Sequence, residues 1–600
     1  MSERNDLLAG GVRWQLRPAE LGGPTPHEAH LLFGRDGLRL PAWLSAGQAT
    51  MVKQNARRTV YHVALPGLDF HLKEYRVADR RDRLRRLVRP GKARLEFDRT
   101  VAVAERGVPT LVPLAVGEAC RGKGPRPSYL ATRTLPDARA LNTFLETDLA
   151  ALPRLRQARL RQRLAVSLGR LLARMHRAGV THHDLHPGNL LLRLGPDDEP
   201  HLYLIDLHAV GLGPPLDWPA ARANLVMLNR WFVLRCDRTD RMRCWHAYRA
   251  EARGERLQLG SRRAALHVEV RAEARDLERR TVASNLRFWR GHDGRCLGDN
   301  RYFRGVHGPE VVGHAVADLP AEALAPLLAE PDGPFRGAGV TVLKDSASSS
   351  VVEFDLATAQ GPRRVIYKRF ALTRWSDPLA ALVRPTPALR SYVLGHGLRL
   401  RCLPTPRPLA VWHRVRHGLR HEGYLLTEKV HDAMDLAAFV DRLAALPPRE
   451  RCVSLRRLID QVARLIATLH QRHLSHRDLK AANLLVSREG WYVSGRGTRE
   501  RRAGPAPADW DQARVWFIDL VGVRRHHKLR RRRRLQNLAR LHASFFCHPA
   551  LTRTDKLRFL RVYLRWGLRG RFGWKRWWRQ IDAATRAKVR RNLRNGRPLG

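Results

Sequence analysis

The chain contains an internal repeat that covers most of its length. LARMHRAGVTHHDLHPGNLL at 172–191 aligns without gaps to IATLHQRHLSHRDLKAANLL at 466–485. Upstream, DFHLKEY at 69–75 matches RVIYKRF at 364–370, at nearly the same separation along the chain. Landmarks that recur in the same order predict a duplicated folding unit rather than one undivided domain.

A third landmark extends the repeat toward the end of each copy. LYLIDLHAVG (202–211) matches VWFIDLVGVR (515–524), after a longer separation because the second copy carries additional residues. The additional segment, 487–512, is rich in Gly, Pro and Arg, which predicts an extended hairpin or a surface loop. Since 600 residues suit two domains of about 300 each, we expect domains at 1–300 and 301–600.

Each copy begins with strand patterns and continues with helix patterns. TVYHVAL (59–65) and SVVEFDL (350–356) alternate apolar and polar residues as the strands of hairpins do. Residues 162–179 and 455–473 place apolar side chains three and four positions apart, which indicates amphipathic helices. This order predicts an α+β class with two tandem bilobal units, each with a β-rich N-terminal lobe and a helical C-terminal lobe.

The chain is strongly basic. Its 110 Lys and Arg against 56 Asp and Glu give a net charge of +54, which attracts nucleic acid, anionic membrane surfaces or phosphorylated glycolipids. A preference for Arg in a GC-rich genome explains the same excess, so the charge indicates a class of partner and no function. With 44% hydrophobic residues the chain can bury substantial cores, which excludes wholesale disorder.

The cysteines and the apolar runs indicate the cellular compartment in which the protein is expected. The seven cysteines are scattered without a CxxC pair, which argues against a zinc site and against a secreted disulfide framework. MSERNDLLAGGVRW has no basic region followed by an apolar core, and no apolar run reaches the length of about 18 residues that a bilayer requires. We therefore expect a cytoplasmic protein without a signal peptide or a membrane span.

The first copy holds the side chains that phosphoryl transfer needs. That chemistry requires a cation for the nucleotide phosphates, oxygen ligands for Mg²⁺, and a carboxylate that orients or deprotonates the acceptor hydroxyl. Lys73 ends an alternating strand, where its ammonium can reach the phosphates of ATP. Asp184 and Asn189 belong to the loop pattern H-x-D-L-x-x-x-N, as base and as Mg²⁺ ligand. Asp206 follows a hydrophobic strand and is the second expected ligand, while His182 is expected to brace the loop.

The second copy repeats this set in the same order. Lys368 is the expected phosphate-binding cation, and Asp478 is the expected base. Asn483 and Asp519 are the expected Mg²⁺ ligands, and His476 is expected to brace the loop. Any one of these motifs is common by chance, whereas the complete set occurring twice favours a protein-kinase-like fold.

These residues resemble the lipopolysaccharide kinase family, protein-kinase-like enzymes that phosphorylate heptose or Kdo sugars of the lipopolysaccharide core. The resemblance rests on HLKEY, KARLEF, HHDLHPGNLL and LIDLH in the first copy, and on YKRF, HRDLKAANLL and FIDLVGVR in the second. It implies ATP and Mg²⁺, a sugar hydroxyl of a glycolipid as acceptor, and work at the inner face of the cytoplasmic membrane. The loop motif is shared by all protein-kinase-like enzymes, so it does not specify the acceptor.

The two copies depart from the kinase pattern in different ways. No G-x-G-x-x-G precedes either lysine. Glu96 stands where a kinase helix supplies the partner of the phosphate-binding lysine, and the second copy has Ser391 there. The second loop instead carries Lys480, as protein kinases do, near the transferring phosphate. The first copy has the complete set, and neither copy can be dismissed.

Two basic tracts follow the second set of motifs. Residues 528–546 are Arg-rich, and 564–580 mix Arg and Lys with four tryptophans, which suits the headgroup layer of an anionic membrane. The alternative is that the tryptophans pack into a helical lobe whose solvated face carries the arginines. We do not expect nucleic acid as partner, because no binding motif accompanies the charge. Arginines beside a kinase cleft also suit an acceptor that already carries phosphates.

Three functions remain open on these residues. The first is a tandem kinase that phosphorylates a lipopolysaccharide-type glycolipid. The second is a Ser/Thr protein kinase, which HRDLKAAN suggests. The third is a pseudokinase-type scaffold that binds anionic surfaces, against which the Asp and Asn present in both loops argue. Acceptor atom, division of labour and oligomeric state do not follow from the sequence.

Overall fold

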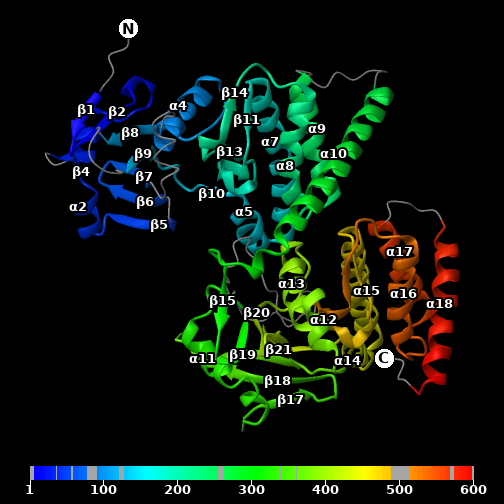
Figure 1. Cartoon of the computed structure of the whole chain (residues 1–600). Helices are drawn as coiled ribbons and strands as arrows, with labels where there is room; N and C mark the ends of the chain where they lie inside the picture. The colour runs from blue at the N-terminus through cyan, green and yellow to red at the C-terminus, as the bar shows by residue number, and fades with distance from the viewer. Residues whose placement is uncertain are drawn as a thin grey trace. The chain divides into compact units, whose positions relative to one another are not determined.

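The computed structural model describes residues 6–34, 37–55, 58–76, 91–119, 127–253, 263–337, 339–359, 361–487, 514–567 and 573–596. The chain forms two compact units, Met1–Asn285 and Leu286–Gly600 (Figure 1). Apart from Ser487, the loop expected at 487–512 lies outside the described residues, as does part of the basic tract at 564–580.

The division between the units falls inside helix α10 (Arg263–His292). The end of this helix belongs to the second unit, because the Trp289 ring lies 4.9 Å from the Arg401 guanidinium. Arg401 also donates to both carboxylate oxygens of Asp293, at 2.6 and 2.9 Å. The sequence predicted the boundary at residue 300, which lies farther along the chain than the division between Asn285 and Leu286.

The first unit begins with a seven-stranded antiparallel sheet in the order β1-β2-β8-β9-β7-β6-β5. Its strands are β1 (Asp6–Ala9), β2 (Val12–Leu16), β5 (Ala49–Asn55), β6 (Arg58–Leu65), β7 (Leu68–Tyr75), β8 (Pro113–Ala119) and β9 (Ser128–Arg133). The short elements α1 (Pro26–Leu32), β3 (Phe33–Gly34), β4 (Gly37–Leu38) and α2 (Leu40–Ser45) connect β2 to β5. Helix α4 (Lys92–Glu105) packs on β8 and β9.

The second unit repeats this sheet strand for strand, in the order β15-β16-β20-β21-β19-β18-β17. Its strands are β15 (Phe303–His307), β16 (Val311–Val316), β17 (Thr341–Lys344), β18 (Ser349–Leu356), β19 (Arg363–Phe370), β20 (Pro408–Arg416) and β21 (Leu419–Glu428). Helix α11 (Ala321–Ala329) precedes β17, and α12 (Asp377–Val383) follows β19. Helix α13 (Pro387–Leu400) packs on β20 and β21 as α4 packs on β8 and β9.

Alternation along the strands decides which side chains face the core. In β7, Leu68, Phe70 and Leu72 are buried on one face, because successive strand residues point to opposite faces. Lys73 therefore projects to the other face, together with Tyr75. In β19 the same alternation buries Tyr367 and turns Lys368 to the opposite face.

The helical lobe of the first unit is built around α7 (Arg154–Arg177). This helix buries Leu160, Leu164, Leu168, Leu171 and Met175, whose three- and four-residue spacing forms a single apolar stripe. It packs mainly against α9 (Arg238–Arg253). The other elements are β10 (Arg139–Ala140), α5 (Leu141–Thr143), β11 (Val180–His182), β12 (Leu190–Leu194), β13 (Pro200–Leu204), β14 (Val210–Leu212) and α8 (Trp218–Phe232).

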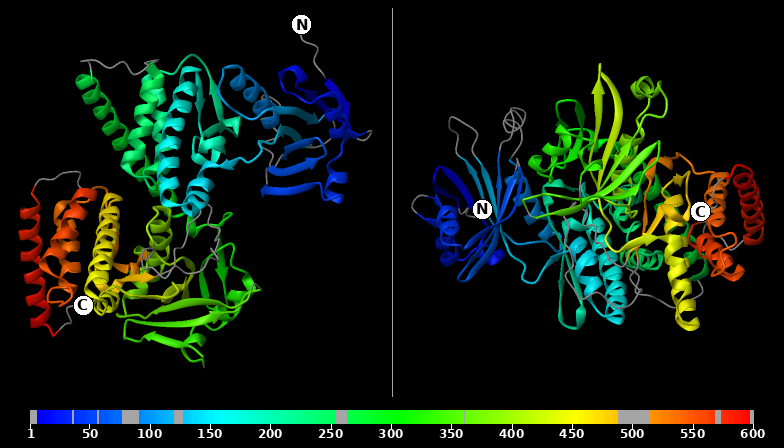
Figure 2. Two further views of the ribbon diagram at one scale, coloured as in Figure 1. Left: turned by 180° about the vertical axis from the view of Figure 1, so that it is seen from behind. Right: turned by 90° about the horizontal axis from the view of Figure 1, so that it is seen from below.

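The helical lobe of the second unit has the same plan. Helix α15 (Pro448–Gln471) packs against α17 (Arg553–Gly567), and α16 (Arg531–Ser544) packs against α18 (Trp574–Arg594). Figure 2 shows these four helices running side by side. The other elements are β22 (Ala433–Asp435), α14 (Leu436–Ala444), β23 (Leu474–His476), β24 (Leu484–Ser487), β25 (Arg514–Phe517) and β26 (Val523–Arg525). None of the described helices combines the length and apolar character that a membrane crossing needs.

The predicted α+β class, with strands first and helices after in each copy, is confirmed. The helices α4 and α13 are each 14 residues long and begin at equivalent places. Ser391 therefore occupies in α13 the helical position that Glu96 occupies in α4.

Candidate active site

Three predicted residues of the first unit meet at the junction of sheet and helical lobe. The Lys73 Nζ atom on β7 lies 2.5 Å from Glu96 Oε1 on α4 and 2.9 Å from Asp206 Oδ1, which follows β13. The side chains of Lys73 and Glu96 are only 13% and 4% exposed. One ammonium therefore joins the strand, the helix and the segment after β13, which is the arrangement that a phosphate-binding lysine requires.

Two further side chains complete this cluster, and sequence reasoning missed both. Arg58, at the start of β6, donates from Nη1 to Asp206 Oδ1 at 2.8 Å. Tyr75 donates its hydroxyl proton to Glu96 Oε2. Strand alternation places both on the face of Lys73, since the register pairs Arg58 with Tyr75 and Val60 with Lys73 on neighbouring strands, but it does not identify their partners.

The charges in the cluster stabilise one another. Burial disfavours ionised Asp206, but the Lys73 ammonium and the Arg58 guanidinium outweigh burial and hold the pKa of this carboxyl well below its usual range. Burial likewise opposes the charge on Lys73, and the carboxylates of Glu96 and Asp206 raise its pKa instead. Lys73 is therefore a permanent cation and Asp206 a permanent anion at neutral pH.

The predicted catalytic loop of the first unit follows β11. The Asp184 side chain is 71% exposed, so its carboxylate is open to an acceptor. Asn189 donates from Nδ2 to the main-chain oxygen of Asp184 at 2.9 Å, which leaves Oδ1 as the atom that can ligate a cation. His182 is fully buried, accepts from the Asp184 amide at Nδ1 and contacts the Ile205 carbonyl through Nε2. Its burial lowers its pKa, so a neutral imidazole braces the loop against the segment that carries Asp206.

In each unit, a buried asparagine on a helix hydrogen-bonds to the backbone of the histidine in the predicted catalytic loop. In the first unit, Asn224 on α8 donates to the His182 carbonyl at 2.8 Å and accepts from its amide at 3.4 Å. In the second unit, Asn537 on α16 makes the same two bonds to His476, both at 3.1 Å. Asn537 lies in the Arg-rich tract at 528–546 that the sequence singled out, but neither asparagine was predicted to hold the loop.

The lysine of the second unit has fewer partners. Lys368 Nζ lies 2.9 Å from Asp519 Oδ1 and 4.7 Å from the centre of the Phe370 ring. Ser391 does not replace Glu96, because its hydroxyl donates to the Pro387 carbonyl within α13. Burial disfavours ionised Asp519, and Lys368 outweighs burial and lowers the pKa of this carboxyl. Among the described residues, a single ion pair thus stands where the first unit has a five-residue network.

The second catalytic loop has the geometry of the first. Asn483 donates from Nδ2 to the Asp478 carbonyl at 2.8 Å and to its carboxylate at 3.2 Å. His476 accepts from the Asp478 amide and contacts the Ile518 carbonyl. Lys480 lies two residues after Asp478, at the position of His186 in the first unit.

Both expected cation sites carry oxygen donors of the kind that Mg²⁺ prefers. Asn189 Oδ1 and the Asp206 carboxylate provide them in the first unit, and Asn483 and Asp519 in the second. Asp206 and Asp519 both adopt left-handed backbone conformations, with φ of 61° and 51°, which non-glycine residues adopt at some cost. Glu96, Asp206 and His208 also lie within 4.8 Å of one another, but the Lys73 ammonium already binds both carboxylates there.

The tryptophans of the C-terminal tract mostly face the core. Trp577 is 7% exposed, and the Arg531 guanidinium lies 4.7 Å from the centre of the Trp577 ring. Trp574 and Trp578 pack against the same helical core, and Trp566 is 43% exposed. For three of the four, packing into the helical lobe describes their surroundings better than contact with a headgroup layer.

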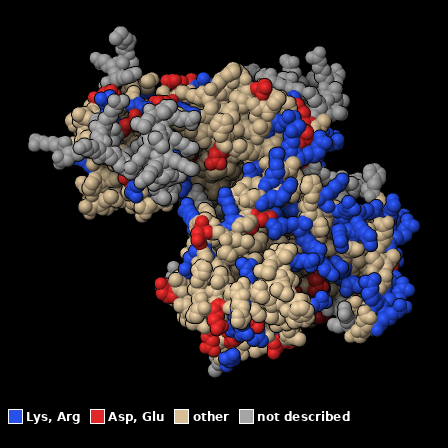
Figure 3. Space-filling view, in the orientation of Figure 1, with Lys and Arg blue, Asp and Glu red and all other residues tan. Residues whose placement is uncertain are grey.

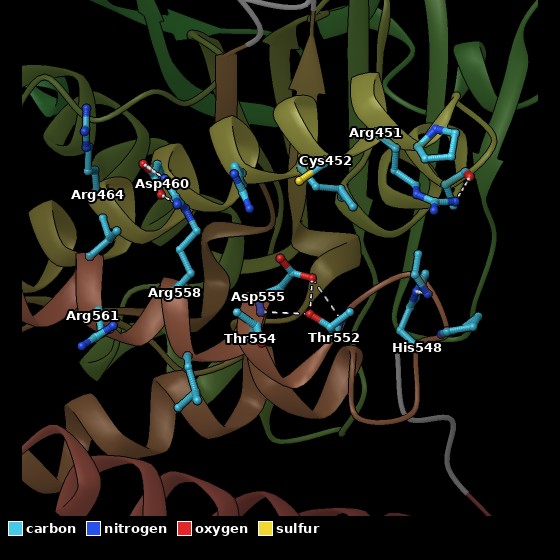
Figure 4. A pocket seen from close by; sticks show the side chains of 18 of the residues that line it. Arg451, Cys452, Asp460, Arg464, His548, Thr552, Thr554, Asp555, Arg558 and Arg561 are labelled. Atoms are coloured by element: carbon cyan, nitrogen blue, oxygen red, sulfur yellow. Dashed lines mark hydrogen bonds and ion pairs between the residues drawn. The ribbon is translucent and has the colours of Figure 1, made fainter.

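A separate hollow of about 1190 Å³ lies between α15 and α17 (Figure 4). Its arginines are partly neutralised, since Arg558 donates to both oxygens of Asp460 at 2.8 and 2.9 Å. Asp555 accepts from the amide and hydroxyl of Thr552 at the start of α17. None of the residues lining it belongs to the predicted catalytic set.

Comparison with known proteins identifies the family of both units. The sequence profile of the lipopolysaccharide kinase (Kdo/WaaP) family matches residues 43–248 and 386–563, together more than half of the chain. The first range holds the complete set from Lys73 to Asp206, and the second begins after Lys368.

Curated relatives agree with this profile. The lipopolysaccharide core heptose(I) kinase WaaP of Pseudomonas aeruginosa is 30% identical over 165 residues, which cover 28% of this chain and 54% of that protein. The 3-deoxy-D-manno-octulosonic acid kinase of Stenotrophomonas maltophilia is 32% identical over 110 residues, 18% of this chain and 40% of that protein. The chain thus spans about half the length, or less, of these relatives.

The solved structure of WaaP in complex with acyl carrier protein is 24% identical and aligns with a TM-score of 0.30, over 43% of this chain and 98% of that one. On the profile matches in both halves, the chain belongs to the lipopolysaccharide kinase (Kdo/WaaP) family, with two tandem kinase-like units.

Proposed function

We propose that the chain transfers the γ-phosphate of ATP to a sugar hydroxyl, of Kdo or heptose, in a lipopolysaccharide core-type glycolipid. The observation that carries this proposal is the meeting of Lys73, Glu96 and Asp206 beside the exposed Asp184, in a chain of this family. Work on such an acceptor brings the protein to the inner face of the cytoplasmic membrane, as a peripheral contact.

In the first unit each side chain has a distinct task. Lys73 donates to the nucleotide phosphates, and Glu96 orients its ammonium. Asp184 accepts a hydrogen bond from the acceptor hydroxyl and takes its proton as the bond to phosphorus forms. Asn189 and Asp206 hold the divalent cation, which we take to be Mg²⁺ and which neutralises charge on the phosphates when bound.

The second unit performs the same steps with Lys368, Asp478, Asn483 and Asp519, and Lys480 stands near the transferring phosphate. Its lysine lacks the carboxylate partner that Glu96 provides in the first unit. We therefore expect the second unit to bind nucleotide less tightly than the first.

Transfer of label from ATP to a lipid A–core extract tests the proposal. Wild type, Asp184→Asn and Asp478→Asn are compared, with label measured in glycolipid and in protein. Label in the glycolipid that one substitution abolishes supports the sugar kinase and names the active unit. Label in protein alone supports the Ser/Thr protein kinase. ATP binding without any transfer overturns the enzyme in favour of a scaffold.

A further inference from the structure

Helix α16 lines the catalytic loop of the second unit along one face. Asn537 bonds to His476 before Asp478, and the Ser544 hydroxyl accepts from the Ala481 amide after it, at 3.1 Å. Arg540 lies between these two contacts on the same face, since residues three and four apart on a helix are neighbours. Arg540 itself is half-buried.

Helix α18 brings a second cation to the same place. The Thr585 hydroxyl contacts the Ala539 carbonyl and His542 on α16, and Lys588 follows one turn later. Burial lowers the pKa of Lys588, Arg540 lowers it further, and the Asp478 carboxylate opposes them. Burial likewise lowers the pKa of Arg540, with Asp478 opposing. Both side chains therefore lie within electrostatic reach of the catalytic carboxylate.

Five cations form this cluster: Arg540 and Lys588 lie within electrostatic reach of Asp478, Arg477 and Arg533 within reach of Arg540, and Lys480 within reach of Lys588. Within the described ranges, none of the five forms an ion pair, and Arg533 donates only to the neutral Gln536. Figure 3 shows Lys and Arg gathered over this helical lobe. Like charges repel one another, so gathering these cations costs free energy unless an anion is bound among them.

The first unit has no such cluster at the equivalent positions. Met227 takes the place of Arg540, and its sulfur accepts from the Leu185 amide at 3.2 Å. Asn229 bonds to Thr281 as His542 bonds to Thr585, which makes Ser284 the equivalent of Lys588. The first unit has His183, His186 and Ala220 where the second unit has Arg477, Lys480 and Arg533. Burial lowers the pKa of Arg230 on α8, and the Asp184 carboxylate opposes this effect, so one arginine lies within electrostatic reach of Asp184 in this unit.

We propose that the two units take acceptors of different charge. The second unit phosphorylates a hydroxyl of a glycolipid that already carries phosphate, and Arg540 and Lys588 bind that phosphate beside Asp478. Guanidinium and ammonium groups pair with phosphate oxygens, and pairing relieves the repulsion among the five cations. The first unit, with Met227 and Ser284, accepts a hydroxyl without a neighbouring phosphate. This inference rests on the proposed function.

Single-unit variants of the full chain test the difference. Asp184→Asn leaves the second unit active and Asp478→Asn the first, and each is assayed with intact and phosphatase-treated lipid A–core extract. We expect dephosphorylation to lower kcat/KM of the second unit by about ten-fold or more, mainly through KM, and to leave the first within about two-fold. Equal effects on both units overturn the inference, whereas absence of glycolipid labelling by both variants overturns the proposed function.

Substitutions on the two helices locate the effect. In the Asp184→Asn chain, Arg540→Met and Lys588→Ser introduce the residues of the first unit and are expected to remove the preference for phosphorylated acceptor. Arg540→Lys is expected to keep most of it. Arg561→Met on α17 is the matched control, since this arginine lines the hollow between α15 and α17 and lies outside the catalytic set. Loss of preference in the control as well contradicts a role for Arg540.

A chemical readout decides the matter without turnover. Acetylation of Lys588 by an N-hydroxysuccinimide ester is followed by mass spectrometry of the full chain. Intact lipid A–core is expected to slow this acetylation several-fold, and dephosphorylated extract is expected not to. Equal protection by both extracts, or protection by neither, overturns the inference even if the second unit transfers no phosphate.

Discussion

The two units fold alike around sites that differ in charge. Both sheets have the same strand order, and both catalytic loops are fixed by a buried histidine and a buried asparagine. The first unit surrounds its lysine with Glu96, Asp206, Arg58 and Tyr75, whereas Asp519 is the one carboxylate that pairs with Lys368 among the described residues. The second unit instead has Arg540 and Lys588 near Asp478, where the equivalent positions of the first unit hold Met227 and Ser284.

This comparison separates the features that the fold requires from the features that differ between the two sites. The loop, its histidine and its asparagine recur, because the backbone path depends on their hydrogen bonds. The partners of the lysine and the surroundings of the catalytic aspartate change between units, since exchanging them leaves that path intact. The nucleotide side is therefore better equipped in the first unit, and the acceptor side is more strongly charged in the second.

Replacing the lysines separates the two units most widely. Lys73→Met leaves two carboxylates without their shared cation, so we expect a loss of about 3–5 kcal/mol in the free energy of unfolding. Lys368→Met breaks one pair whose aspartate is 38% exposed, and solvent screening limits the loss to about 1 kcal/mol or less. Thermal unfolding of both variants measures the difference, and equal losses contradict the contrast between the sites.

Exchanging the helix residues tests whether one carboxylate explains the contrast in nucleotide binding. Glu96→Ser frees the Lys73 ammonium to move, and we expect kcat/KM for ATP in the first unit to fall about ten- to a hundredfold. Ser391→Glu places a carboxylate within the reach that Glu96 has, and we expect the second unit to gain a few-fold. Initial rates in the single-unit backgrounds are the measurement. An unchanged first unit means that Glu96 does not position the lysine.

The pH dependence of stability tests how much the ion pair between Arg58 and Asp206 contributes to the free energy of unfolding. The pKa of Asp206 is held below its unfolded value of about 3.9, so its ion pairs stabilise the fold above pH 4 and are lost as pH falls. We expect Arg58→Leu to cost about 1–3 kcal/mol at pH 7 and progressively less below pH 4. Denaturant unfolding at several pH values measures this cost. A difference between variant and wild type that stays constant with pH contradicts the assignment.

Much of the site followed from the sequence because its motifs are local. Asp184 and Asn189 lie five residues apart in one loop, and the internal repeat aligns Glu96 with Ser391. Arg58 was missed because its partner Asp206 lies 148 residues away, and strand alternation indicates a face without naming a contact. The asparagines on α8 and α16 were missed for the same reason. The tract at 528–546 indicated Arg533 and Arg540, whereas Lys588 was missed because α18 meets the loop only in the folded chain.

Calorimetric titration with MgATP tests the central claim, two nucleotide sites of unequal strength in one chain, most directly. We predict two sites in the wild type, with the tighter site lost in Lys73→Met and the weaker site lost in Lys368→Met. A single site that only one of these substitutions removes would contradict the claim and leave one unit without a role in phosphate transfer.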